Sequence, residues 1–123
     1  MKRRAALRPP TVLAYSEDDG VLASLRLLLA EVYPEAELYC TDRVEDAVSH
    51  GTGTVIDLAL LDQAHSQRLS PLIRLLRGHS PSVKVVVFAE DLFDSSQRVT
   101  RWQEVRAIVT RTLKRQEAGA LQP

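Results

Sequence analysis

The sequence predicts an α/β fold in which a five-stranded parallel sheet is the middle layer of a three-layer sandwich. Short apolar or β-branched runs alternate along the chain with segments whose apolar residues recur at helical spacing. Parallel strands require long crossover connections, which are usually helical and almost always right-handed. The alternation therefore favours a doubly wound sheet with helices on both faces.

Five segments are expected to be strands, from apolar runs, β-branched residues or strict alternation. In chain order they are residues 11–15, 35–40, 55–61, 83–88 and 107–109. The second segment alternates and places Ala36, Leu38 and Cys40 on one side. The third is almost continuously apolar up to Asp62, which is typical of a strand covered on both faces.

Five further segments are expected to be helices, and start or stop signals mark several of their ends. They are residues 21–32, 42–51, 70–78, 94–102 and 112–118. Asp42 and Glu45 have the spacing of a capping box, and Gly51 would end the second helix. Ser70 and Pro71 form an N-cap and first-turn pair for the third helix.

The chain has 123 residues, which is the length of one compact domain. Residues 1–10 carry four positive charges and a proline pair, so we expect a basic flexible arm before a domain over residues 11–123. Cys40 is the one cysteine and can form no internal disulfide, which favours a reducing compartment. The apolar runs are too short to cross a bilayer or to form the core of a signal peptide. We therefore expect a cytoplasmic protein.

The charges cancel overall but are segregated along the chain. Sixteen basic and sixteen acidic residues give no net charge, which argues against attraction of the whole domain to nucleic acid or to an anionic membrane. Residues 17–62 contain eleven acids and two bases, whereas residues 98–117 contain six bases and two acids. One part of the surface should therefore be acidic and another part basic.

Carboxylates follow the ends of two predicted strands. Glu17, Asp18 and Asp19 come after the first strand, and Asp62 ends the third. The carboxyl ends of parallel strands meet at one edge of the sheet, so these groups should converge and repel each other unless a cation lies among them. Mg2+ prefers oxygen ligands and is often held by carboxylates beside a phosphoryl group. Asp62 could then act as a nucleophile and form an aspartyl phosphate.

Four motifs resemble the receiver domain of bacterial response regulators: VLAYSEDDG, DLALLD, SPLIRLLR and PSVKVVVFAE. The resemblance covers residues 11 to 113 and implies the flavodoxin-like fold of CheY. It implies that Asp62 accepts phosphate from a histidine kinase, with no enzymatic activity beyond its own phosphorylation and dephosphorylation. It further implies that Glu17 and Asp18 bind Mg2+ with Asp62, the alternative acidic pair being Asp18 and Asp19.

The sequence departs from the family pattern at three positions. A gapless count puts Ala89 where the family has Thr or Ser at the end of the fourth strand. The same count puts Arg111 at the position of the family's lysine, with Thr110 as the alternative, and Ile108 at an aromatic position of the last strand. Arginine keeps the charge of lysine but presents a planar fork in place of a compact ammonium.

Two functions therefore stay open. The first is a two-component signalling domain with Asp62 as phosphoacceptor and Mg2+ at the acidic rim. The second is a pseudo-receiver, a protein-interaction module that is independent of phosphorylation. The expected partners are a histidine kinase or another signalling protein, and a second copy bound through the face of the fourth helix, last strand and last helix. We expect no direct contact of this domain with nucleic acid or membrane.

Overall fold

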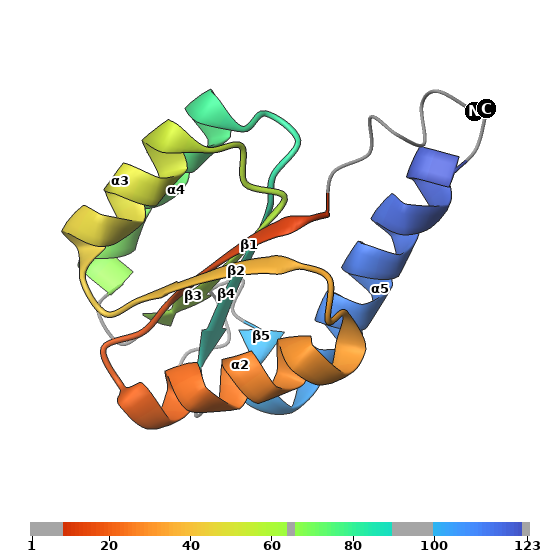
Figure 1. The fold of residues 1–123 in the computed structure, drawn as a ribbon. Coiled ribbons are helices and arrows are strands. Elements are labelled where there is room, and N and C mark those ends of the chain that lie inside the picture. Colours follow the sequence, from red (N-terminus) through yellow and green to blue (C-terminus); the bar gives the residue numbers. More distant parts are fainter. Residues whose placement is uncertain (1–8, 64–65, 90–99, 122–123) are drawn as a thin grey trace.

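A computed structural model describes residues 9–63, 66–89 and 100–121, and in it a parallel five-stranded sheet lies between two helical layers (Figure 1). The strands are β1 (Thr11–Tyr15), β2 (Glu37–Thr41), β3 (Leu58–Asp62), β4 (Lys84–Ala89) and β5 (Thr100–Arg101). The helices are α2 (Asp19–Val32), α3 (Val44–Gly53), α4 (Ser66–His79) and α5 (Trp102–Leu121). The strand order is β2-β1-β3-β4-β5, and the predicted α/β class is confirmed.

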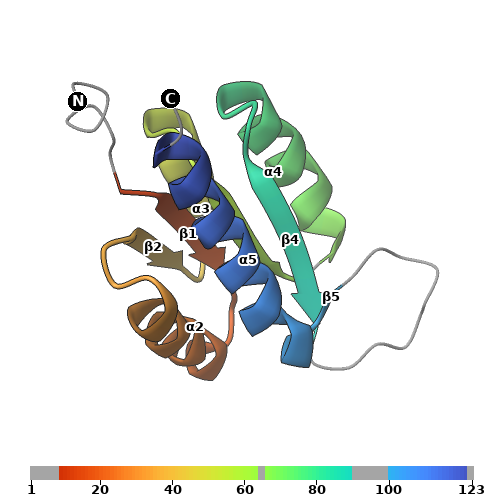
Figure 2. The ribbon, with the colours of Figure 1, turned by 90° about the vertical axis from the view of Figure 1, so that its right-hand side faces the viewer.

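The alternation of side chains along each strand divides the core into two halves. Figures 1 and 2 show α2 and α5 on one face of the sheet and α3 and α4 on the other. Strand residues of the half under α2 and α5 are Val12, Ala14, Leu58, Leu60, Val86 and Phe88. Strand residues of the half under α3 and α4 are Leu13, Tyr15, Ala59 and Leu61. Both faces of β1 and β3 are therefore buried, as the apolar run that ends at Asp62 predicts.

Helix α2 shows how local sequence fixes the start of an element. The Asp18 side chain is the N-cap, and its Oδ1 accepts hydrogen bonds from the backbone N–H groups of Gly20 at 2.8 Å and Val21 at 3.4 Å. These bonds satisfy donors that have no partner within the helix. Leu25 and Leu29 then bury one face of α2 in the core.

The predicted capping box of the next helix is wrong. The N-cap of α3 is Arg43, which makes no side-chain capping bond, and α3 runs past Gly51 to Gly53. The turn before α3 is held by Thr41, whose Oγ1 accepts a hydrogen bond from the Arg43 N–H at 3.1 Å. Asp42 is exposed and caps no helix.

Helix α4 begins at Ser66, four residues before the predicted N-cap Ser70, and Pro71 lies inside it. A proline in a helix interior has no N–H to bond the carbonyl four residues earlier, which here belongs to Gln67. Leu69, in the added turn, is only 2% exposed and packs in the core under α3 and α4. Its burial accounts for a helix start that the local capping signal does not favour.

The predicted last strand is wrong. Residues 107–109, expected as that strand, lie within the long helix α5, whereas the helix expected over 112–118 is confirmed as part of α5. The last strand is β5, two residues that pair with Phe88 and Ala89. Val105, Val109 and Leu113 recur every four residues and are buried, so the helical period decides this segment. The helix expected over 94–102 lies outside the described residues up to position 99.

Within the described ranges, the helices include none with the length and apolar character that a bilayer crossing would require.

Helices α3 and α4 approach closely at Gly51, and this contact gives a test of the packing. A Cβ atom at Gly51 would lie 2.7 Å from Leu76 Cδ2, whereas at Gly53 it would meet no atom within 4 Å. Leu76 is fully buried, so its side chain would have to shift within the core to admit this atom. Overpacking of this kind costs about 1–3 kcal/mol, while the gain in helix propensity is similar at both positions.

We expect Gly51→Ala to be less stable than Gly53→Ala by about 2 kcal/mol. Urea unfolding of the two variants and the wild type measures the difference. Equal stability of the two alanine variants would contradict the close approach of α3 and α4.

Candidate functional site

The candidate site lies at the carboxyl edge of the sheet, where β1, β3 and β4 end side by side. Tyr15 pairs with Leu61, and Asp62 pairs with Phe88. Side chains alternate along a strand, so Ser16, Asp62 and Phe88 fall on the face of the sheet that carries α2 and α5. Asp62 is partly exposed at this edge, as the sequence predicts.

The Ser16 side chain contacts Asp62, although no motif in the sequence singles Ser16 out. Its Oγ donates a hydrogen bond of 2.7 Å to Asp62 Oδ2 and accepts one of 3.0 Å from the Asp18 N–H. Its backbone N–H donates to the Thr41 carbonyl at 3.2 Å. Ser16 is completely buried, so these bonds fix the hydroxyl beside the carboxylate.

The acidic residues expected at this edge have other partners. Tyr15, whose ring lies in the core under α3 and α4, donates from its hydroxyl to Glu17 Oε2 at 2.8 Å. The Asp18 carboxylate caps α2. Glu17, Asp18 and Asp19 are all exposed. The structure thus brings Ser16 to Asp62, while the Glu17 carboxylate accepts from Tyr15 and the Asp18 carboxylate accepts from the start of α2.

The predicted magnesium ligands do not come together as a complete carboxylate set among the described residues. Across residues 9–63, 66–89 and 100–121, no group of three or more His, Cys, Asp or Glu side chains could hold a metal ion. A serine hydroxyl that donates to Asp62 takes up one of the carboxylate oxygens that a metal would use. Binding of Mg2+ by Glu17, Asp18 and Asp62 stays a prediction.

The residue beside Asp62 on β4 is Phe88, not Ala89. Asp62 and Phe88 are paired, and Phe88 is 2% exposed in the core half under α2 and α5. Ala89 alternates to the opposite face. Ala89 as the counterpart of the family's Thr or Ser stays a prediction, and neither Phe88 nor Ala89 has a side-chain hydroxyl.

Arg111 does not end a strand. It is an exposed residue in the middle of α5, and its neighbour Thr110 donates a side-chain hydrogen bond to the Arg106 carbonyl within the same helix. Ile108, expected on the last strand, is a partly buried residue of α5. The residue that ends β5 is Arg101, which pairs with Ala89. Arg111 and Ile108 were assigned to the end of the sheet because residues 107–109 were expected to form the last strand, and these residues are helical.

Two ionisable side chains on other elements, Glu31 and Cys40, have shifted pKa values. A hydrogen bond and ion pair with Arg106 lower the pKa of Glu31 and join the exposed faces of α2 and α5. Burial raises the pKa of the Cys40 thiol on β2, and the nearby Arg26 opposes that shift only in part. A raised thiol pKa disfavours the reactive thiolate, so Cys40 is no candidate nucleophile.

No protein-family model matches the sequence, and no curated protein matches it. Solved structures do match: the receiver domain of a DNA-binding response regulator from Colwellia psychrerythraea has a TM-score of 0.71 at 15% identity, over 89% of this chain and 98% of that chain. The chain has the receiver fold. A response regulator from Thermotoga maritima has a TM-score of 0.68 at 17% identity, over 87% of this chain and 96% of that one.

The same fold occurs in a protein whose name refers to pilus assembly. A putative pilus assembly-related protein from Burkholderia pseudomallei matches this receiver-like chain with a TM-score of 0.65 at 23% identity, over 92% of each chain. At these identities the likeness is one of fold.

The contact between Ser16 and Asp62 can be measured with a double-mutant cycle. We expect Ser16→Ala and Asp62→Ala to be coupled by about 1–2 kcal/mol in unfolding free energy, because either change removes the same charge-assisted hydrogen bond. Chemical denaturation of the wild type, both single variants and the double variant gives the coupling.

Thr52→Ala provides the matched control, since this exposed hydroxyl donates to the Val48 carbonyl within α3. It should show no coupling to Asp62→Ala. A cycle for Ser16 and Asp62 that is additive within error would contradict the contact.

Proposed function

We propose that this chain is a receiver-like signalling module that acts through protein interaction and does not depend on phosphorylation of Asp62. The observation that carries the proposal is the 2.7 Å hydrogen bond from Ser16 Oγ to Asp62 Oδ2. A buried hydroxyl stands where a metal-dependent phosphoacceptor needs negative charge to hold its cation. The carboxylate is stabilised by a neutral donor of the chain itself.

Phe88 supports the proposal from the neighbouring strand. A phosphoryl group on Asp62 would bring about two negative charges and several oxygen acceptors to this edge. Phe88, paired with Asp62 and almost completely buried, has no donor to offer to these oxygens. The surroundings of Asp62 thus include a hydroxyl that already donates a hydrogen bond, from the end of β1, and an apolar ring on β4.

A second candidate function is that of a phosphoacceptor. The position of Asp62 favours it, because a partly exposed carboxylate at the carboxyl end of a central strand is accessible to a phosphodonor. In this function a histidine kinase is the partner, and Glu17 or Asp18 must leave its present contact to help bind Mg2+. A homodimer through the face of the fourth predicted helix, β5 and α5 belongs to this alternative, and that predicted helix, over 94–102, lies outside the described residues up to position 99.

The structural neighbours support a partner outside two-component signalling. The pilus assembly-related protein has higher identity to this chain, at 23%, than the two response regulators described above, at 15% and 17%. We include a role within an assembly complex of that kind in the proposal, with the domain as a docking module of fixed conformation.

The proposal is tested with Mg2+ and beryllofluoride, a mimic of the phosphoryl group. We expect the amide resonances of Ser16, Asp62 and Phe88 in the wild type to stay unchanged at millimolar concentrations of both. Ser16→Asp should gain Mg2+ binding, because it places a second carboxylate next to Asp62. Ser16→Asn, of similar size but neutral, is the control and should bind no Mg2+.

The opposite result would establish the second function. Amide shifts in the wild type that need both Mg2+ and beryllofluoride, and that disappear in Asp62→Ala, would show a working phosphoacceptor site. Two-dimensional NMR titrations of the four proteins distinguish the two outcomes.

A further inference from the structure

The outer edge of β2 presents backbone groups without a partner strand. β2 lies at the end of the strand order and pairs on one side with β1. The Glu37 N–H donates to the Pro10 carbonyl, and the Thr41 carbonyl accepts from the Ser16 N–H. Alternate residues of β2 therefore face β1, and the N–H and C=O groups of Leu38 and Cys40 between them point away from the sheet. Within the described ranges, no strand pairs with this outer side of β2.

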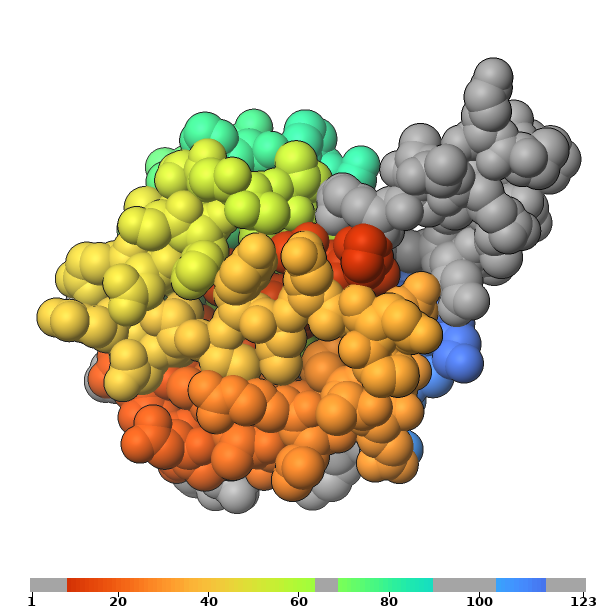
Figure 3. Space-filling model, viewed as in Figure 1, coloured from red at the N-terminus to blue at the C-terminus, as the bar shows by residue number. Residues whose placement is uncertain are grey.

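Several of the devices that commonly protect an edge strand are missing from β2 itself. Its sequence, ELYCT, has no proline and no lysine, and its register with β1 is regular over all five residues, without a bulge. Figure 3 shows the yellow-orange band of this part of the chain on the visible surface, between α2 below and α3 above. The edge is therefore available to an added strand.

Charge gives this edge a preference for one kind of partner. Residues 35–46 contain five acids and one base, and the acids lie on both sides of the uncharged stretch from Leu38 to Thr41. The five acids, all exposed, are Glu35, Glu37, Asp42, Glu45 and Asp46. Antiparallel pairing with a second copy would bring acidic ends together and is disfavoured. A segment with basic residues on both sides of an uncharged centre is complementary.

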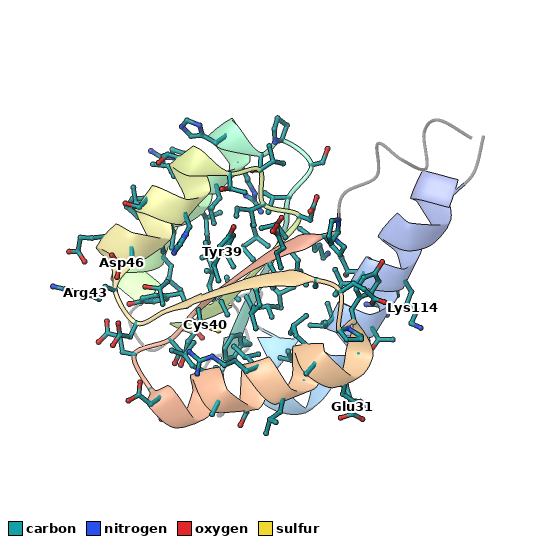
Figure 4. All side chains as sticks on the ribbon, in the orientation of Figure 1. Glu31, Tyr39, Cys40, Arg43, Asp46 and Lys114 are labelled. Atoms are coloured by element: carbon teal, nitrogen blue, oxygen red, sulfur yellow. The ribbon has the colours of Figure 1, made fainter. Side chains whose placement is uncertain are left out.

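Side chains on both faces of the sheet provide contacts for such a segment. On the α3 side, Tyr39 stacks on His50 with ring centroids 4.5 Å apart and an interplanar angle of 16°. On the α2 side, Leu38 and Cys40 are partly buried against the core. Figure 4 shows Tyr39 and Cys40 along β2, with Arg43 and Asp46 at the end where α3 begins. An added strand would therefore meet an aromatic surface on one face and an apolar surface on the other.

We propose that the free edge of β2 binds an extended segment of a partner protein, with a short uncharged centre flanked by Lys or Arg, as a sixth strand. The outward N–H and C=O groups of Leu38 and Cys40 supply the hydrogen bonds. The flanking carboxylates select the basic ends and speed the encounter. This binding surface does not include Asp62. The strand-binding proposal can therefore be wrong while the proposed function is right, and the proposed function can be wrong while the strand-binding proposal is right.

The probe is an eight-residue peptide with Val-Thr-Val-Thr at its centre and a Lys-Arg pair at each end. Two control peptides carry either Glu pairs at the ends or methyl groups on the four central backbone nitrogens. We expect the basic peptide to bind the full chain and both control peptides to show no binding up to millimolar concentration. Fluorescence anisotropy of the labelled peptides gives the dissociation constants.

Two variants separate local charge from overall charge. Glu37→Lys with Asp42→Lys should weaken binding of the basic peptide by about tenfold or more, because both exposed acids flank the edge. Asp19→Lys with Glu104→Lys changes the net charge equally at exposed positions on α2 and α5 and should change binding by less than about twofold.

Hydrogen exchange of the wild type locates the contact without any substitution. The basic peptide should slow exchange of the Leu38 and Cys40 amides. Lack of binding, binding that leaves these amides unprotected, or equal binding of the methylated peptide would overturn the proposal. Either of the last two results would mean that the acidic residues attract the basic peptide nonspecifically, without pairing of a strand with β2.

Discussion

The burial of both faces of the two central strands is the constraint on which the rest of the structure depends. All five residues of β1 are buried, and so are the four apolar residues of β3. A strand of this kind needs a helical layer on each side, and crossover connections supply both layers while keeping all strands parallel. The carboxyl ends of β1, β3 and β4 are thereby forced to one edge, where Ser16 and Asp62 meet.

The two-residue period of the strands then decides which groups meet at that edge. Tyr15 and Glu17 fall on the side of α3 and α4, whereas Ser16 and Asp62 fall on the side of α2 and α5. Asp18 turns outward and caps a helix. Carboxylates that are adjacent in sequence are thus separated in space. The Glu17, Asp18 and Asp62 carboxylates each accept a hydrogen bond from within the chain.

The sequence predicts the fold well where burial and local signals agree, and fails where they conflict. Long apolar runs identify β1, β3 and β4 because no competing pattern exists there. The apolar run at residues 107–109 looks like a strand in isolation, but the four-residue spacing from Val105 to Leu113 is the stronger signal. Ser70 and Pro71 are good helix starters, yet the burial of Leu69 extends α4 in front of them.

The candidate site was predictable in its location but not in its chemistry. Asp62 could be found because an acid at the end of an apolar strand is conspicuous. A shift of one residue moves a side chain to the other face of the sheet, so the pairing of Asp62 with Phe88 had to come from the structure. Ser16 has no sequence signal, because a serine before an acidic stretch is typical of any loop, and only its burial reveals its role.

Pro71 has a consequence for the motions of the folded protein. Its missing N–H removes one hydrogen bond, to the Gln67 carbonyl, from the ladder that joins the first turn of α4 to the rest of the helix. The burial of Leu69 anchors this turn in the core. Local openings of a native protein have smaller free energies where fewer hydrogen bonds must break. We therefore expect the first turn of α4, directly after the strand that ends at Asp62, to open at a lower free energy than the central strands of the sheet.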